Sequence, residues 1–465
     1  MAESNWSRRD AMLGATIGVA ALAMPSSAQA PDDAVDRLVA DFMRAFGTPG
    51  VAVTIVRASQ PVLARGYGVR RMGRPERVDA DTLFGIASNT KAFVAAGLAM
   101  LVEAGKLGWD EPVVRYLPDF ATSDQVVTRL MTVRDLLCHR SGLPLGAGDL
   151  MQFPLSDHSR ADIYHGLKYL PFERGFRSGY AYDNILYVVA GVLIERVTGM
   201  SYEDYMTTAV LRPLGMVHAV ADSALLRTAN VAGRHSRPGP PVIGVGPLKV
   251  AEPDESLAGS PAGGNHASAR EIALWLQTQL ARGVTPAGRR LWSEANAAEM
   301  WTPQVITGTT DGPNADDPTR PVLKAYALGV PAFDWVAAAK RVQSENEAMA
   351  RAAAGTGDFQ PPPGGPSLPL AAYAGRFRDP WYGDIVVRAD GAGLLIDFTR
   401  TPVYKSRLEP FGPDTFRTRF APGTENAVVA FVIQNGRPVR LKLHPLSPLA
   451  DFSYDFQHLT PVRVD

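Results

Sequence analysis

The stretch DTLFGIASNTKAFVAAGL, residues 81–98, places Ser88 and Lys91 three residues apart at the start of an apolar helical pattern. Side chains at positions i and i+3 lie on one face of a helix, so the Lys91 amine can approach the Ser88 hydroxyl. Burial disfavours the ammonium form, which would let Lys91 accept the proton of a serine nucleophile. The alternative is that Ser88 caps the helix and Lys91 is a surface residue. Because a chain of this length contains roughly one chance Ser-x-x-Lys, the motif alone favours the cap.

The segment YAYDNILYVVAG, residues 180–191, adds Tyr182 and Asn184 directly before a second apolar helical pattern. A neighbouring cation lowers the pKa of a phenol, so Tyr182 could share proton transfer with Lys91. Asn184 has a donor and an acceptor for a substrate amide. The alternatives are that Tyr182 is an interior aromatic and that Asn184 caps the helix that begins at Ile185. A lysine leading into an apolar helix is costly unless it is used, which favours a catalytic role.

The composition is that of a globular protein of two or three domains, with 465 residues, 46% of them hydrophobic and 20% charged. Basic and acidic residues both number 47, and no long basic run is present, which argues against a nucleic-acid-binding protein. The single cysteine, Cys138, excludes an internal disulfide and a multi-cysteine metal site. Its apolar surroundings are typical of a buried thiol.

Residues 1–30 have the pattern of a twin-arginine signal peptide. Paired arginines at positions 8 and 9 precede an uncharged apolar run over 11–24, and small residues allow cleavage after position 28 or 30. The run is too short to span a bilayer. We therefore expect export to a bacterial periplasm, with no stable membrane span after cleavage. An uncleaved membrane anchor is the alternative.

Hydrophobic periodicity predicts an α+β domain over 31–354, a Pro/Gly-rich linker over 355–370 and an all-β domain over 371–465. The first domain begins with a helix and an antiparallel hairpin over 50–71, and helical periodicity follows to about residue 282. Strands followed by helices predict a sheet backed by helices. The last domain is expected to be a small barrel or sandwich.

Four segments, in order over about residues 33–329, resemble the serine β-lactamase-related hydrolases. They are DTLFGIASNTKAF, TVRDLLCHRSGLP, YDNILYVVAGVLIERVTGMSYEDYM and AGGNHASAREIALWL. The family includes class C β-lactamases, D,D-peptidases, D-aminopeptidases and family VIII esterases, and the tail, with ADFSYDF, resembles a small β domain appended to some members. The resemblance implies a penicillin-binding-protein-like domain, an antiparallel sheet with a helical subdomain. It also implies acyl transfer without metal or cofactor: Ser88 attacks a carbonyl, Lys91 and Tyr182 move protons, and Asn184 positions the substrate.

The third motif of this family, Lys-Thr-Gly or His-x-Gly, is absent from the sequence. It should follow YALG (326–329), but the chain continues with VPAFDWVAAAK, which resembles the segment after the missing strands. Xaa-Thr-Gly occurs at a helix end (197–199), in an expected polar loop (306–308) and in the linker (355–357). His266 could lie near the site, although a loop histidine is more often structural. Part of the sheet is therefore expected to be missing, either from the protein or through an error in the recorded sequence.

These patterns predict an exported serine hydrolase that forms an acyl-enzyme at Ser88 with an amide, such as a small peptide or β-lactam-like compound, or with an ester. The alternative is a non-catalytic or impaired penicillin-binding-protein-like homologue that binds peptide or cell-wall fragments. The expected partner is a small-molecule or short-peptide substrate, with no nucleic acid and no cofactor. The sequence leaves the substrate class and the oligomeric state open.

Overall fold

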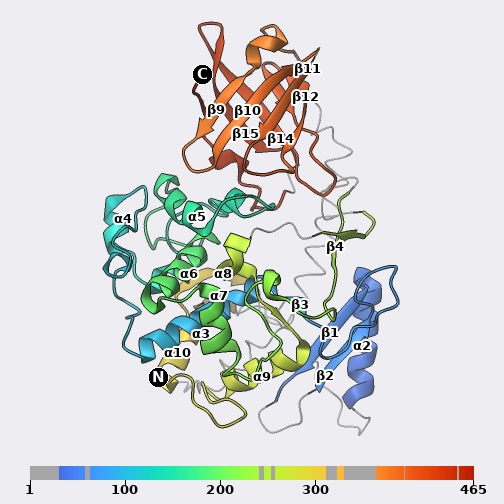
Figure 1. The fold of residues 1–465 in the computed structure, drawn as a ribbon, viewed down its shortest axis with the longest axis vertical. Helices are drawn as coiled ribbons and strands as arrows, with labels where there is room; N and C mark the ends of the chain where they lie inside the picture. The colour runs from blue at the N-terminus through green and yellow to red at the C-terminus, as the bar shows by residue number, and fades with distance from the viewer. Residues whose placement is uncertain are drawn as a thin grey trace, which may run out of the picture.

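The computed structural model describes residues 31–57, 63–239, 246–252, 257–310, 322–328, 363–391, 393–447 and 450–465. The expected signal peptide, most of the linker and the junction at Gly329 and Val330 lie outside these ranges. Figure 1 shows a helix-rich body, drawn blue to yellow, and a β-barrel, drawn orange to red.

The helix-rich body is built mainly of α-helices joined by short 3-10 turns. The α-helices are α2 (Pro31–Phe46), α3 (Thr90–Glu103), α4 (Gln125–Leu130), α5 (Arg160–Gly166), α6 (Ile185–Thr198), α7 (Tyr202–Tyr205), α8 (Ser260–Gly263), α9 (Ala269–Leu280) and α10 (Glu294–Trp301). The 3-10 helices are η1 (Ala87–Asn89), η2 (Val113–Arg115), η3 (Arg134–Leu136), η4 (Asp149–Met151), η5 (Leu167–Tyr169), η7 (Ser223–Leu225) and η8 (Leu257–Gly259), and η6 (Met206–Leu211) is a π-helix. Its strands are β1 (Gly50–Ile55), β2 (Leu63–Gly68), β3 (Phe84–Gly85), β4 (Arg234–Ser236), β5 (Lys249–Ala251), β6 (His266–Ala267), β7 (Val305–Thr310) and β8 (Val322–Tyr326).

Helices α3 and α6 form the centre of this body, as their apolar sequences predict. Almost every side chain of α3 from residue 90 to 99 is buried, and α6 is buried from Ile185 to Gly191. Phe93 of α3 stacks on Trp275 of α9, with ring centroids 4.1 Å apart. Helix α6 ends at Gly199, whose φ of +71° closes the helix in the left-handed region that glycine adopts readily.

In the described part of the chain no single helix is long and apolar enough to cross a membrane. Residues Ile185–Thr198 and Tyr202–Leu211 meet the length and composition criteria only when taken together, and the pair is bent by 78°.

The expected hairpin is confirmed as β1 and β2, which pair antiparallel with Gly50 opposite Gly68. Both strands are half-buried throughout, and α2 and α9 pack against them. Among the described residues, the strands of this body form only two-stranded pairs: β1–β2, β3–β6, β4–β5 and β7–β8.

The expectation that residues 306–308 form a polar loop was wrong. Ile306, Thr307 and Gly308 lie on β7, which pairs with β8. Valine, isoleucine and threonine, which make up most of β7, fit a pleated surface well, and this preference outweighs the polar character of the threonines. The Thr-Gly at 198–199 does lie at the end of a helix, as expected.

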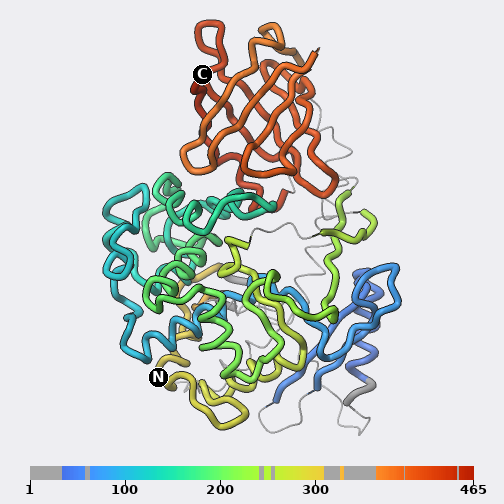
Figure 2. Tube along the Cα trace, in the orientation of Figure 1, coloured from blue at the N-terminus to red at the C-terminus, as the bar shows by residue number. Residues whose placement is uncertain are grey.

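The C-terminal domain is a closed barrel of antiparallel strands in the order β10-β11-β12-β13-β14-β15-β16-β9 (Figure 2). The strands are β9 (Gly375–Asp379), β10 (Gly383–Asp390), β11 (Gly393–Phe398), β12 (Lys405–Gly412), β13 (Thr415–Arg417), β14 (Ala427–Gln434), β15 (Arg437–Pro445) and β16 (Val462–Arg463), with 3-10 turns η9 (Leu370–Tyr373) and η10 (Phe456–His458). Alternate side chains of β11 point into the barrel, where Phe398 packs against Tyr404 and Phe456. An α+β body followed by an all-β barrel confirms the predicted fold class.

The barrel sits next to α5 (Figure 1), and polar contacts join the two bodies. The Arg400 side chain of the barrel forms ion pairs with Asp157 and Asp162. The buried His158 ring lies 2.9 Å from the backbone oxygen of Tyr382.

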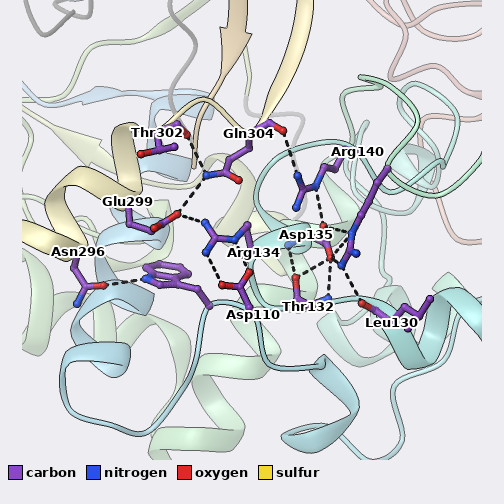
Figure 3. A network of polar contacts seen from close by, with 12 residues as sticks. Asp110, Leu130, Thr132, Arg134, Asp135, Arg140, Asn296, Glu299, Thr302 and Gln304 are labelled. Atoms are coloured by element: carbon purple, nitrogen blue, oxygen red, sulfur yellow. Dashed lines mark hydrogen bonds and ion pairs between the residues drawn. The ribbon is translucent and has the colours of Figure 1, made fainter. Parts of the chain in front are cut away.

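A polar network holds the segment TVRDLLCHRSG, residues 132–142, in place (Figure 3). The fully buried Asp135 accepts hydrogen bonds from Arg140 Nε at 2.8 Å and from Arg177 Nη2 at 2.6 Å. Burial alone would raise the pKa of Asp135, but hydrogen bonds from Arg177 and Thr132 lower it. Arg140 also donates to the backbone oxygen of Gln304, which ties this segment to the chain just before β7. The charged residues here therefore serve the fold.

Candidate active site

Ser88 lies on η1, immediately before α3, and its side chain caps neither helix. The N-cap of η1 is Ile86 and that of α3 is Asn89, and neither makes a side-chain capping bond. The preceding residue, Ala87, has a φ of +45°, a strained value for a residue with a side chain. This turn leaves Ser88 exposed, so the interpretation as a helix cap is excluded.

Lys91 is completely buried, and its amine makes three polar contacts. It donates to Asn184 Oδ1 and to the backbone oxygen of Ala262, both at 2.7 Å, and lies 3.1 Å from Ser88 Oγ. The first two partners can only accept. All three oxygens accept from the amine in this arrangement, and the neutral form of the amine, with two N–H donors and one lone pair, is the form that can take the Ser88 proton.

Burial lowers the pKa of Lys91 to about 7, against a smaller opposing effect of Asp149 and Asp183. A substantial fraction of the amine is therefore neutral near physiological pH. This environment agrees with the expectation that burial lowers the pKa of Lys91 enough for its neutral amine to act as a base.

Tyr182 completes the contact with the nucleophile, because its hydroxyl lies 2.6 Å from Ser88 Oγ. Its ring also lies 4.8 Å from Lys91 Nζ. The expectation that a cationic neighbour would lower the pKa of Tyr182 was wrong: burial raises it well above the ordinary value. Because Lys91 is itself desolvated and close to neutral, it supplies little positive field. Tyr182 thus stays a neutral phenol, and both its hydroxyl and the Lys91 amine, which donates to Ser88 Oγ, contact the nucleophile.

Asn184 holds the lysine and does not cap α6. Its side chain makes no capping bond; Nδ2 donates to Asp149 Oδ2 at 2.9 Å, while Oδ1 accepts from Lys91. The backbone N–H of Leu186 in the first turn of α6 is instead bound by Asp183. Because an ammonium or amine of lysine donates and Asp149 accepts, only one orientation of the Asn184 amide satisfies both neighbours.

Two members of the site were missed by sequence reasoning. Asp149 lies in GAGDL, which carries no motif, and Ala262 contributes only its backbone oxygen. Burial, followed by the nearby Asp455, raises the pKa of Asp149 well above its ordinary value.

The remaining candidates have structural roles. His266 pairs with Gly85 between β6 and β3, and its Nδ1 lies 3.0 Å from the Gly264 oxygen. Burial raises the pKa of the Cys138 thiol to about 12, so the expectation of an unreactive thiol is confirmed. Within the described ranges, no group of three or more His, Cys, Asp or Glu side chains could hold a metal ion.

The Beta-lactamase family model matches residues 35–365, and the model of a domain of unknown function, DUF3471, matches residues 360–462. The first match covers well over half of the chain, and the second coincides with the barrel.

Curated relatives match part of the chain. Protein flp of Staphylococcus aureus (strain N315) is 27% identical over 251 residues, which cover 53% of this chain and 48% of that protein. Unguisins hydrolase ungD' of Aspergillus campestris is 30% identical over 278 residues, covering 57% of this chain and 49% of that protein. The chain thus spans about half the length of these relatives.

Solved structures share the fold at low sequence identity. D-amino acid amidase from Ochrobactrum anthropi SV3, complexed with L-phenylalanine, superposes with a TM-score of 0.51 and 19% identity, covering 92% of this chain and 94% of that chain. The octameric penicillin-binding protein homologue from Pyrococcus abyssi superposes with a TM-score of 0.50 and 19% identity, covering 93% of this chain and 100% of that chain. The buried Lys91 beside Ser88, the fold and the match over residues 35–365 lead to one conclusion: the chain belongs to the serine β-lactamase-related hydrolase family.

Proposed function

We propose that this protein is a serine hydrolase that forms an acyl-enzyme at Ser88 with an amide or an ester. One observation carries the proposal: the fully buried Lys91 amine lies 3.1 Å from Ser88 Oγ, in surroundings that lower its pKa to about 7. The names of two similar proteins, an amidase and an unguisins hydrolase, support hydrolytic chemistry. Export to the periplasm is part of the proposal and is supported by the sequence pattern of residues 1–30.

In the proposed reaction, Ser88 Oγ attacks the carbonyl carbon of the substrate while its proton moves to Lys91 Nζ. The tetrahedral intermediate collapses as the leaving group takes a proton through Tyr182, which regains one from Lys91. Water then attacks the acyl-enzyme and gives its proton to Lys91. The second tetrahedral intermediate collapses, the bond between the acyl carbon and Ser88 Oγ breaks, and Ser88 Oγ takes the proton back from Lys91. Asn184 keeps Lys91 in line with Ser88 through both steps.

The second candidate function is binding without turnover, and the absent Lys-Thr-Gly or His-x-Gly motif favours it. Loss of one oxyanion donor typically lowers turnover by about a hundred- to a thousandfold, which would leave a slow enzyme. Acylation of Ser88 separates the two functions, since a binder without a reactive serine takes up no acylating probe.

We expect a fluorophosphonate probe to add one phosphonyl group per chain, on the peptide that contains Ser88. Intact-mass spectrometry followed by peptide mapping measures this. Chromogenic esters and amino-acid amides assayed on the same preparation then identify the substrate class. An unlabelled protein, or a label on another serine, contradicts the proposal.

Tyr182→Phe is expected to lower the labelling rate and the turnover by roughly a hundredfold, the lower range for loss of one proton-transfer group. The phenyl ring keeps its place beside Lys91 but no longer donates to Ser88 Oγ. Tyr180→Phe is the matched control, because Tyr180 packs near His139 without being part of the Ser88–Lys91 contact. Equal rates for the two variants would exclude Tyr182 from proton transfer.

A further inference from the structure

The barrel reaches the catalytic centre through residues 451–459, which connect β15 to β16. This connection carries η10 and runs along the helix-rich body next to η4. Its aromatic residues pack there: Tyr454 lies against Phe153, and Phe452 lies edge-on to Tyr182 with ring centroids 5.6 Å apart.

The approach of this connection is close enough to require a glycine. A side chain at Gly146 would bring its Cβ to 2.5 Å from the backbone oxygen of Phe452. Gly146 also has a φ of +72°, and its N–H donates to the backbone oxygen of Tyr182. The barrel therefore contacts the segment that is bonded to the catalytic tyrosine.

Asp455 is the buried anchor of the connection. Its carboxylate accepts hydrogen bonds from the backbone N–H groups of Gly148, at 2.8 Å, and of Leu150, at 3.0 Å. His458 Nδ1 lies 3.2 Å from the same carboxylate. The two backbone donors flank Asp149, so Asp455 fixes the turn from which the Asp149 side chain projects.

From this turn a chain of hydrogen bonds leads to the nucleophile. Asp149 accepts from Asn184 Nδ2, and Asn184 Oδ1 accepts from the Lys91 amine beside Ser88. Ser453, two residues before Asp455, also hydrogen-bonds to the Asp149 side chain. Ser453 thus contacts the carboxyl group that orients the asparagine, and Asp455 holds the backbone of the turn that carries it.

We propose that the barrel takes part in the catalytic centre through Asp455, a positioning residue that fixes the turn carrying Asp149 and thereby orients Asn184. The inference rests on the proposed function, because it concerns the base of the same reaction. It gives the DUF3471 domain of this chain a specific role: to keep the lysine base aligned with the serine.

The test begins with Asp455→Asn. The new amide directs an NH₂ group at one of the two backbone donors, so the turn shifts and Asn184 loses its anchor. We expect fluorophosphonate labelling of Ser88 to slow by up to about a hundredfold, the loss that a displacement of about 1 Å can cause. Ser453→Ala, which removes a single bond to Asp149, is expected to slow labelling less.

A double-mutant cycle with Asn184→Ala separates positioning from general stability. If Asp455 acts through Asn184, then Asp455→Asn causes no further loss in the Asn184→Ala background. Additive losses, or an unchanged rate in Asp455→Asn, would overturn the inference. Should Asp455→Asn fail to fold, Ser453→Ala replaces it in the same cycle with the same criteria.

Arg400→Gln is the control, since it breaks the ion pairs between barrel and body at Asp157 and Asp162 without touching η4. We expect its labelling rate to equal that of the wild type; an equal slowing would assign the effect to domain docking and overturn the inference. If the wild type is labelled and Asp455→Asn is labelled at the same rate, this inference is overturned but the proposed function stands. A wild type that takes up no label overturns the proposed function and this inference with it.

Discussion

Ser88→Ala is expected to abolish the fluorophosphonate adduct and to lower hydrolysis by roughly 10⁴- to 10⁶-fold, the range for removal of a serine nucleophile. The variant keeps its fold, because Ser88 is exposed and its side chain caps neither η1 nor α3. The alanine removes the oxygen that both Lys91 and Tyr182 contact. Intact mass and turnover, measured on the same preparation, check the prediction.

Ser178→Ala is the matched control for this substitution. Ser178 is also exposed and lies in the same body, where its hydroxyl donates to the backbone oxygen of Gly175. It should label and turn over like the wild type. An adduct of the same mass on Ser88→Ala would show that the reactive serine lies elsewhere.

The part of the site that the sequence reveals is the part built from local spacing and side-chain type. Ser88 and Lys91 are one helical turn apart, so their contact follows from the helix itself. Tyr182 and Asn184 stand directly before the second apolar helical pattern, in a segment that resembles the β-lactamase-related hydrolases. All four lie together in the structure, in the mutual contacts described above.

The rest of the site is built by segments far apart in the sequence, and by groups that no sequence motif marks. Ala262 contacts Lys91 through a backbone oxygen 171 positions away, and any residue type supplies such an oxygen. Asp149 is one acidic residue among many until its burial beside Asn184 is known. The direction of the pKa shift of Tyr182 was mispredicted for a related reason. It depends on the burial of both Tyr182 and Lys91, whereas periodicity indicates only which face of a helix is buried.

The same distinction holds for the fold. Apolar periodicity predicts α6 and its end at Thr198 and Gly199, which the structure confirms. Alternating short runs located the barrel strands, but their closure into a barrel depends on pairing between β9 and β16, the first and last strands of the domain. Contacts between residues far apart in the sequence also determine where Asp455 lies. The residues on either side of Asp455 carry no pattern that predicts those contacts.

Lys91→Met is expected to lower acylation and turnover by roughly 10³- to 10⁴-fold, because the apolar side chain fills the buried site but accepts no proton. In the wild type, activity should rise with pH through about 7 and then level off, since the neutral amine is the active base and its fraction increases as pH passes the pKa of Lys91. In Lys91→Met this rise should be lost. Initial rates of labelling and turnover, measured across the pH range for both proteins, check the prediction.

Lys91→Arg distinguishes a base from a mere positive charge at this position. A guanidinium stays protonated throughout the accessible pH range and has no lone pair to offer. If Lys91 acted only by attracting negative charge, arginine would preserve much of the activity, and the wild-type rate would fall as pH rises through the pKa of Lys91 and the charge is lost. The burial of Lys91 makes the opposite outcome the expected one, because it lowers the pKa of the amine to about 7 and so leaves a neutral base 3.1 Å from Ser88 Oγ.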